Sequence, residues 1–204
     1  MNIILLSTAA VLGLLAFFEP CTIATHTLFA VRTHKTNPPQ RWLALLQLVL
    51  PRTVLLATIF GSAAWVGLSA VSPYLALFML VMVGTIYLLT RKIYLPVPHL
   101  EFFRLLPHHD GLSQGLKLGL TLPACTLPLV AVVGVIAALS QQHATALLAG
   151  VVFAAMFSLP TVWHSIRGLA TEQLGILGKA ARVSPYFTAL LLWGAALVIL
   201  ITGV

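Results

Sequence analysis

Residues 16–25, AFFEPCTIAT, place a carboxylate, a proline and a cysteine in the middle of an apolar stretch that spans residues 3–31. No Lys or Arg precedes this stretch, whereas a signal peptide begins with a basic segment, so we expect it to be retained as a membrane span. Of the 204 residues, 60% are hydrophobic and 7% are charged, and the mean hydropathy is +1.04. Because soluble domains carry about 25% charged residues, this composition excludes a soluble enzyme and predicts an integral membrane protein.

Further apolar stretches predict an all-α protein with six transmembrane helices. Six spans of about 20 residues with tight turns would use nearly the whole chain, so we expect one transmembrane domain over residues 1–204. Its predicted spans are residues 3–31, 42–71, 73–89, 112–139, 144–163 and 185–202.

The basic residues predict the orientation in the membrane. The net charge is +7, and every Lys and Arg except Arg52 lies in or beside three loops on one face, at residues 33–41, 91–110 and 167–182. The positive-inside rule makes that face cytoplasmic and places both termini outside. A basic soluble protein would suggest nucleic acid, but no nucleotide-binding or nucleic-acid-binding motif is present, so we expect no nucleic-acid partner.

Short segments of the first half return in the second half in the same order. The offsets are 104, 109 and 112 residues, which indicates a three-helix unit used twice, over about residues 1–92 and 110–204. A unit with three spans enters the membrane from opposite sides in its two copies, so we expect inverted repeats related by a pseudo-two-fold axis in the membrane plane. The matching segments are CTI 21–23 with CTL 125–127, LPRTV 50–54 with LPTV 159–162, and SPY 72–74 with SPY 184–186.

The only two cysteines, Cys21 and Cys125, are equivalent residues in this repeat. Cys21 lies about 16 Å of helix from Arg32, and Cys125 about 12 Å from Lys117, which compares with about 15 Å for half a bilayer core. Both cysteines are therefore predicted near the middle of the membrane, close to one axis, as the candidate reactive pair. The alternative is that each is a small buried apolar residue.

Prolines stand beside both cysteines: Pro20 directly precedes Cys21, while Pro123 and Pro128 bracket Cys125. Proline removes an amide donor and crowds the preceding turn, so we expect both helices to break beside the thiol. Broken helices persist in a membrane only where they are packed in protein or line a wet cavity. The alternative is an ordinary kink, which is common in membrane helices. We also expect proline to break the helices of the second and fifth spans, at Pro51 and Pro160.

Charged and titratable residues inside the predicted spans are candidate site residues. Glu19 and Arg52 lie at similar distances from the loop between the first two spans, which predicts an ion pair. Arg52 would favour a thiolate on Cys21. Alternatively, Arg52 marks the start of a shorter span, with residues 42–50 at the interface. His26 is a candidate proton carrier for a thiol, or else a hydrogen-bonded residue without a catalytic role.

Two short motifs carry a resemblance to a known family. EPCT at residues 19–22 and LPACTLP at residues 122–128, with the glycine-containing aliphatic spans 75–89 and 187–203, resemble the CcdA/DsbD family of membrane electron transporters. The resemblance covers the whole chain, and the absence of soluble domains makes it more similar to CcdA. The chain departs from the family pattern in lacking a proline after Cys21, in placing Ala124 between Pro123 and Cys125, and in carrying Glu19 and Arg52.

The resemblance implies a thiol-disulfide oxidoreductase that transports electrons across a bacterial or archaeal cytoplasmic membrane. A Cys21–Cys125 dithiol/disulfide would accept two electrons from cytoplasmic thioredoxin and pass them to an extracytoplasmic thioredoxin-like protein, without a cofactor. The candidate supporting residues are Pro20, Pro123 and Pro128 at the expected helix breaks, together with Glu19 and Arg52, which come from the charges inside the spans and not from the resemblance. Reduction of apocytochrome c during cytochrome c maturation, or of another external thiol-dependent maturation factor, is the downstream use that the resemblance implies.

Two other function classes remain open from the sequence. A transporter of a soft metal cation would use the two cysteine thiolates, with His26, as ligands. A non-catalytic assembly protein would carry the cysteines incidentally. The run His108-His109-Asp110 has no matching ligands elsewhere, so we assign no metal site to it.

Overall fold

The computed structural model is mostly helical and describes residues 2–66, 78, 81–82, 84–85, 89, 100–105, 112–140 and 142–202. Most of the predicted third span at 73–89, the SPY segment at 72–74 and the run His108-His109-Asp110 lie outside the described residues. The elements in chain order are α1 (Asn2–Phe17), α2 (Pro20–His34), α3 (Pro38–Val66), β1 (Leu100–Glu101), η2 (Phe102–Leu105), α5 (Gln114–Gly119), β2 (Thr121–Leu122), η4 (Ala124–Thr126), α6 (Leu127–Ser140), α7 (His143–Arg167) and α8 (Thr171–Thr202).

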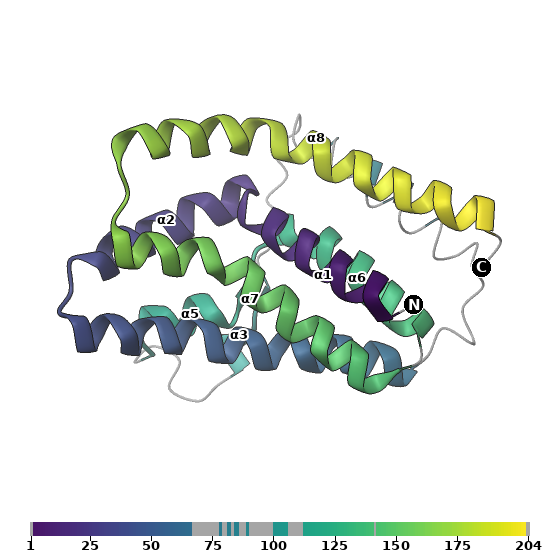
Figure 1. The fold of residues 1–204 in the computed structure, drawn as a ribbon, viewed down its shortest axis with the longest axis horizontal. Coiled ribbons are helices and arrows are strands. Elements are labelled where there is room, and N and C mark those ends of the chain that lie inside the picture. The colour runs from purple at the N-terminus through teal and green to yellow at the C-terminus, as the bar shows by residue number, and fades with distance from the viewer. Residues whose placement is uncertain are drawn as a thin grey trace.

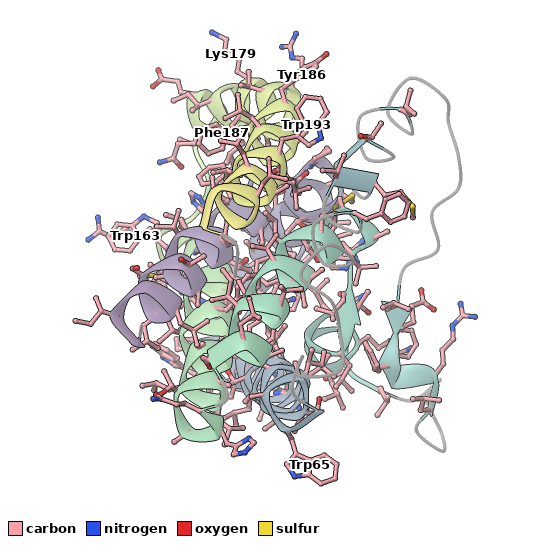
Figure 2. The ribbon with its side chains drawn as sticks, turned by 90° about the vertical axis from the view of Figure 1, so that its right-hand side faces the viewer. Trp65, Trp163, Lys179, Tyr186, Phe187 and Trp193 are labelled. Carbon is pink, nitrogen blue, oxygen red and sulfur yellow. A yellow bond between two sulfur atoms is a disulfide. The ribbon has the colours of Figure 1, made fainter. Side chains whose placement is uncertain are left out.

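The helices form a bundle in which α7 packs against α1, α2 and α3 (Figure 1). Helix α8 runs along one edge of the bundle and α3 along the opposite edge, with α1, α2 and α7 between them. The apolar core contains the buried rings of Phe60, Phe153 and Phe157, from α3 and α7. Labelled aromatic side chains such as Trp65 and Trp163 project outward from the helices (Figure 2).

The apolar character of the described helices supports a membrane protein. Two of them, Pro38–Trp65 and His143–Arg167, are long and apolar enough to cross a bilayer. The pair Leu5–Phe17 and Pro20–His34 would form a third span if it is counted as one broken helix. The count of six spans and the inverted repeat stay predictions.

Both expected helix breaks beside the cysteines are present. The first predicted span divides between Phe17 and Pro20, where the chain bends by 74°. The predicted span at 112–139 is not one helix, because it is interrupted between α5 and α6 by β2 and η4. Strand β2 pairs antiparallel with β1, which supplies backbone partners to the interrupted segment.

The predicted breaks at Pro51 and Pro160 are wrong, because α3 and α7 continue through both prolines. Apolar helices tolerate proline where neighbouring groups satisfy the backbone. Each proline lacks the amide that would bond to the carbonyl four residues earlier, at Gln47 and at Met156, so each removes one helical hydrogen bond. The remaining turns of α3 and α7 keep both helices continuous.

The predicted loop at residues 167–182 is also wrong for most of its length. Helix α8 begins at Thr171 and continues to Thr202, so only a short turn around Gly168 joins it to α7. The charged residues Lys179 and Arg182 are exposed on this helix, and the Nε atom of Arg182 donates to the carbonyl of Gly178 at 3.4 Å. Exposed basic residues are compatible with a helix as well as with a loop, so their charge does not determine the secondary structure of the segment.

Two glycines allow α7 to approach its neighbours closely. A Cβ atom at Gly13 of α1 would lie 2.5 Å from the carbonyl oxygen of Phe153, and one at Gly150 would lie 2.5 Å from the Cα of Ala57. Small residues at such contacts let helix backbones meet, as membrane helix pairs commonly require. The α7 contacts with α1 and α3 therefore depend on these two positions.

We expect Gly150→Val to lower the free energy of unfolding by about 1–3 kcal/mol, because the added methyl groups would meet the backbone of Ala57. Denaturation of the detergent-solubilised protein measures this loss. Gly134→Val on α6 is the matched control, since a Cβ there meets nothing within 4 Å. Equal stability of the two variants would contradict close packing of α3 on α7.

Candidate active site

The structure brings Cys21 and Cys125 together although 104 residues separate them. Cys21 is the second residue of α2 and Cys125 lies in η4, so each cysteine stands at one of the two helix breaks. Their sulfur atoms are joined in a disulfide, with the two Cα atoms 6.8 Å apart. The site is therefore formed by two interrupted helices that meet at their sulfur atoms.

The prolines place both sulfur atoms near helix N-termini. Pro20 occupies the first position of α2 and follows Glu19, whose backbone is extended at φ −65° and ψ 140°. On the other side, Pro123 precedes η4, and Pro128 lies in the first turn of α6. Amide groups at a helix N-terminus favour negative charge, and the thiolate is the reactive form of cysteine. Both breaks thus suit a sulfur that becomes a thiolate.

The two cysteines differ in exposure and in neighbours. Cys21 is partly exposed, whereas Cys125 is only 8% exposed. The Oγ1 atom of the fully buried Thr22 lies 4.0 Å from the sulfur of Cys125. Cys21 is therefore the more accessible sulfur, and Cys125 has a hydroxyl donor beside it.

Glu19 is fully buried at the first break, where its Oε1 accepts a 2.6 Å hydrogen bond from Oγ1 of Thr188. Thr188 belongs to α8, so this bond connects the segment preceding Cys21 to the C-terminal helix. Sequence reasoning did not identify Thr188 as a partner of the buried carboxylate.

Arg52 is fully buried inside α3 and donates hydrogen bonds to groups from three other elements. Its guanidinium group lies 4.3 Å from the ring centroid of Phe157. Among the described residues, its Nε atom has no hydrogen-bond partner. The acceptors are the carbonyl of Leu118 at 2.9 Å, Nε2 of His26 at 3.1 Å and Oγ of Ser158 at 3.3 Å.

These contacts determine the tautomer of His26. Arginine has no acceptor atom, so Nε2 of His26 accepts from Arg52 and Nδ1 carries the ring proton. Nδ1 then donates to Oγ1 of Thr161 at 2.6 Å, and the ring stacks on Phe157 at 5.3 Å. With both ring nitrogens engaged, His26 acts as a neutral acceptor for Arg52, and this geometry does not favour a proton carrier.

Glu19 and Arg52 do not form the predicted ion pair. The hydrogen bonds of the Arg52 guanidinium go to Leu118, His26 and Ser158, while the Glu19 carboxylate accepts from Thr188. Glu19 and Arg52 would lie at similar depth only if the first helix were straight, but the chain bends by 74° beside Glu19, and its carboxylate bonds to Thr188 of α8. The alternative, with Arg52 at an exposed start of the second span, also fails because the side chain is fully buried within α3.

Besides Thr188, the sequence did not identify three other polar residues of the site, Thr22, Ser158 and Thr161, although their spacing contains a signal. Thr22 and His26 are four residues apart on one face of α2, and both are fully buried. Ser158 and Thr161 are three residues apart on α7 and both contact the Arg52–His26 pair. Polar residues at helical spacing within an apolar span indicate such a centre.

Over the described ranges, no three His, Cys, Asp or Glu side chains gather as potential metal ligands. No protein-family model, no curated protein and no solved structure matches the chain. The fold and site define a mostly helical chain with apolar, membrane-compatible helices and two cysteines that meet at helix breaks.

We expect His26→Leu to destabilise the protein by about 1–3 kcal/mol, because it removes a buried acceptor from Arg52. His26→Gln is the matched variant, since its amide can accept from Arg52 and donate to Thr161. Denaturation midpoints of the solubilised variants measure the difference. If the Leu and Gln variants were equally stable, the hydrogen bonds of His26 would not support Arg52.

Proposed function

We propose that this chain is a transmembrane thiol-disulfide electron transporter of a bacterial or archaeal cytoplasmic membrane. It takes two electrons from cytoplasmic thioredoxin and delivers them to an extracytoplasmic thioredoxin-like protein. The observation that carries the proposal is the meeting of Cys21 and Cys125 at two helix breaks within an apolar bundle. Delivery to the cytochrome c maturation pathway is the use that the family resemblance favours.

The order of elements supports six spans arranged as two inverted repeats. In each half, a helix interrupted at a cysteine is followed by a long helix with an internal proline. The first half shows this order in α1, α2 and α3, and the second half in α5, α6 and α7. Interrupted helices at a repeat interface are typical of transporters that expose one central site alternately to each side. Both termini then lie outside.

The proposed reaction is a pair of thiol-disulfide exchanges. A thiolate of the reduced donor attacks the sulfur of Cys21, the Cys21–Cys125 bond breaks, and Cys125 leaves as a thiolate that takes up a proton. The donor's second thiolate attacks the donor sulfur of the mixed disulfide, which releases Cys21 for protonation and oxidises the donor. The transporter thereby gains two electrons and two protons. It then delivers them to the disulfide of the external acceptor, and the Cys21–Cys125 disulfide forms again.

Two observations support different roles for the two cysteines in the first exchange. Cys21 is partly exposed in the first turn of α2, which suits the sulfur that a donor attacks. Cys125 is buried and has the Thr22 hydroxyl beside it, which suits a leaving thiolate that needs a hydrogen-bond donor. No metal or organic cofactor enters these steps.

We expect Cys21→Ser and Cys125→Ser each to abolish electron transfer in vesicles with reduced thioredoxin on one side and an oxidised thioredoxin-like acceptor on the other. Either change leaves one cysteine without its partner, so the Cys21–Cys125 disulfide that accepts the electrons cannot form. Ala124→Ser is the matched control, because it introduces a serine at the same break without removing a sulfur. Electron transfer by either cysteine variant would overturn the proposal. If the reduced wild-type protein bound a soft metal ion stoichiometrically but transferred no electrons, the metal-transporter alternative would be supported.

We expect Thr22→Val to slow formation of the mixed disulfide with thioredoxin about tenfold, because a hydrogen bond to a charged group contributes roughly 1.5–3 kcal/mol. Thr22→Ser keeps the hydroxyl and should keep most of the rate. A thioredoxin without its resolving cysteine traps the intermediate, and peptide mapping locates the bond, which we expect at Cys21. A bond at Cys125, or equal rates for the Val and Ser variants, would contradict these roles.

A further inference from the structure

A pocket of about 580 Å³ lies away from the cysteines, where the C-terminal ends of α2 and α7 meet the start of α8. These three helix ends lie together at the left end of the bundle in Figure 1. The pocket is lined by side chains and backbone from all three helix ends, including His34, Trp163, Arg167, Gly168 and Gln173. None of these residues takes part in the proposed electron transfer.

Gly168 gives the pocket its shape. This residue ends α7 with φ at +82°, a backbone conformation that favours glycine. A Cβ atom at this position would lie 3.1 Å from Nε2 of His34. The tight turn therefore brings the start of α8 beside the ends of α7 and α2, with the His34 ring packed close to the backbone of Gly168.

Hydrogen-bond donors face this space. The guanidinium group of Arg167 lies 4.0 Å from the ring centroid of Trp163, a contact with the ring face that leaves its N–H groups available. Across the described ranges, no ion pair involves Arg167. Gln173 accepts from the Ala170 amide through Oε1, so its own amide group remains a donor. A guanidinium with a neighbouring amide suits an oxyanion such as phosphate.

His34 adds a third polar group. Its Nδ1 donates to the carbonyl of Ser165 at 3.1 Å, which leaves Nε2 on the side of Gly168. The carboxylate closest in sequence, Glu172, is exposed in the first turn of α8 and is not among the residues that line the pocket. The lining charge is therefore positive.

An apolar stripe runs from the pocket along the outer face of α7. Leu159, Trp163 and Ile166 recur at helical spacing and are 54%, 50% and 40% exposed. Figure 2 shows Trp163 pointing away from the bundle. Helix α7 is one of the two helices long and apolar enough to span a membrane, and tryptophan is enriched at membrane interfaces. The stripe therefore suits acyl chains.

We propose that this pocket binds the headgroup phosphate of an anionic phospholipid, whose acyl chains lie along the Leu159–Trp163–Ile166 stripe. A phospholipid uses both the cationic pocket and the adjoining apolar stripe. A free phosphate ion or an acidic side chain of a partner protein would use the pocket alone. The site is independent of the cysteines and of the proposed electron transfer.

Titration of the full chain in detergent with phosphatidylglycerol, followed by native mass spectrometry, tests this site. We expect Arg167→Gln to weaken binding about tenfold, as loss of a charge-assisted hydrogen bond predicts. Lys179→Gln is the matched control, because it removes a charge from an exposed position of α8 outside the pocket and should leave affinity unchanged. Circular dichroism of each variant verifies that the helices are retained.

Four results would overturn the lipid site. Equal weakening by Arg167→Gln and Lys179→Gln would indicate general attraction to a basic surface. Equal affinity for phosphatidylcholine would remove the requirement for an anionic headgroup. Displacement of the lipid by millimolar inorganic phosphate would identify a site for a soluble anion, because phosphate makes no contact with the stripe. An acidic peptide that displaces the lipid equally well would indicate a protein partner.

Discussion

The architecture depends on how two interrupted helices satisfy their backbone groups in an apolar bundle. An unpaired peptide group is costly in such surroundings, so an interruption is stable only where other groups supply partners. At the second break, Thr126 donates its hydroxyl to the carbonyl of Pro123 at 2.8 Å, and β1 pairs with β2. At the first break, the Phe18 amide donates to the carbonyl of Leu15 and the Ile23 amide donates to the carbonyl of Glu19, both at 2.9 Å. These local bonds allow the two cysteine segments to lie next to each other.

A buried polar centre holds the surrounding helices together. Arg52 of α3 bonds to α2 through His26, to α7 through Ser158 and to α5 through the carbonyl of Leu118. Thr161 fixes the other side of the His26 ring. A buried cation with several acceptors would be strongly destabilised if one acceptor were lost, so the network favours one arrangement of these helices. Because Thr22 precedes His26 by one turn of α2, the same arrangement positions the hydroxyl beside Cys125.

The meeting of the two cysteines at helix breaks was predictable from the sequence, whereas the polar groups around them were not. Proline beside each cysteine predicted both breaks correctly, since the local effect of proline at Pro20 and Pro123 is strong. The same rule failed at Pro51, where α3 continues although one helical hydrogen bond is lost. Whether Glu19 can reach Arg52 depends on the direction that the chain takes at the first break. That direction is determined by the 74° bend. The spacing of residues cannot supply that angle.

The partners of Arg52 also depend on tertiary structure. The Leu118 carbonyl becomes its acceptor because the predicted fourth span is interrupted, which brings α5 against α3. The charged residues at 167–182 led to the prediction of a loop, because charge indicates where a segment lies relative to the bilayer. Charge does not indicate whether the backbone is helical, and α8 begins within this segment.

The central claim is that Cys21 and Cys125 form a reversible disulfide within the membrane domain. The most direct measurement is equilibration of the wild-type protein in lipid nanodiscs over a series of thioredoxin redox buffers, with mass spectrometry of the cysteine peptides. The account predicts one two-electron transition between a Cys21–Cys125 disulfide and two alkylated thiols. Two cysteines that remain alkylated under oxidising buffers, or that react independently with external thiols, would contradict it.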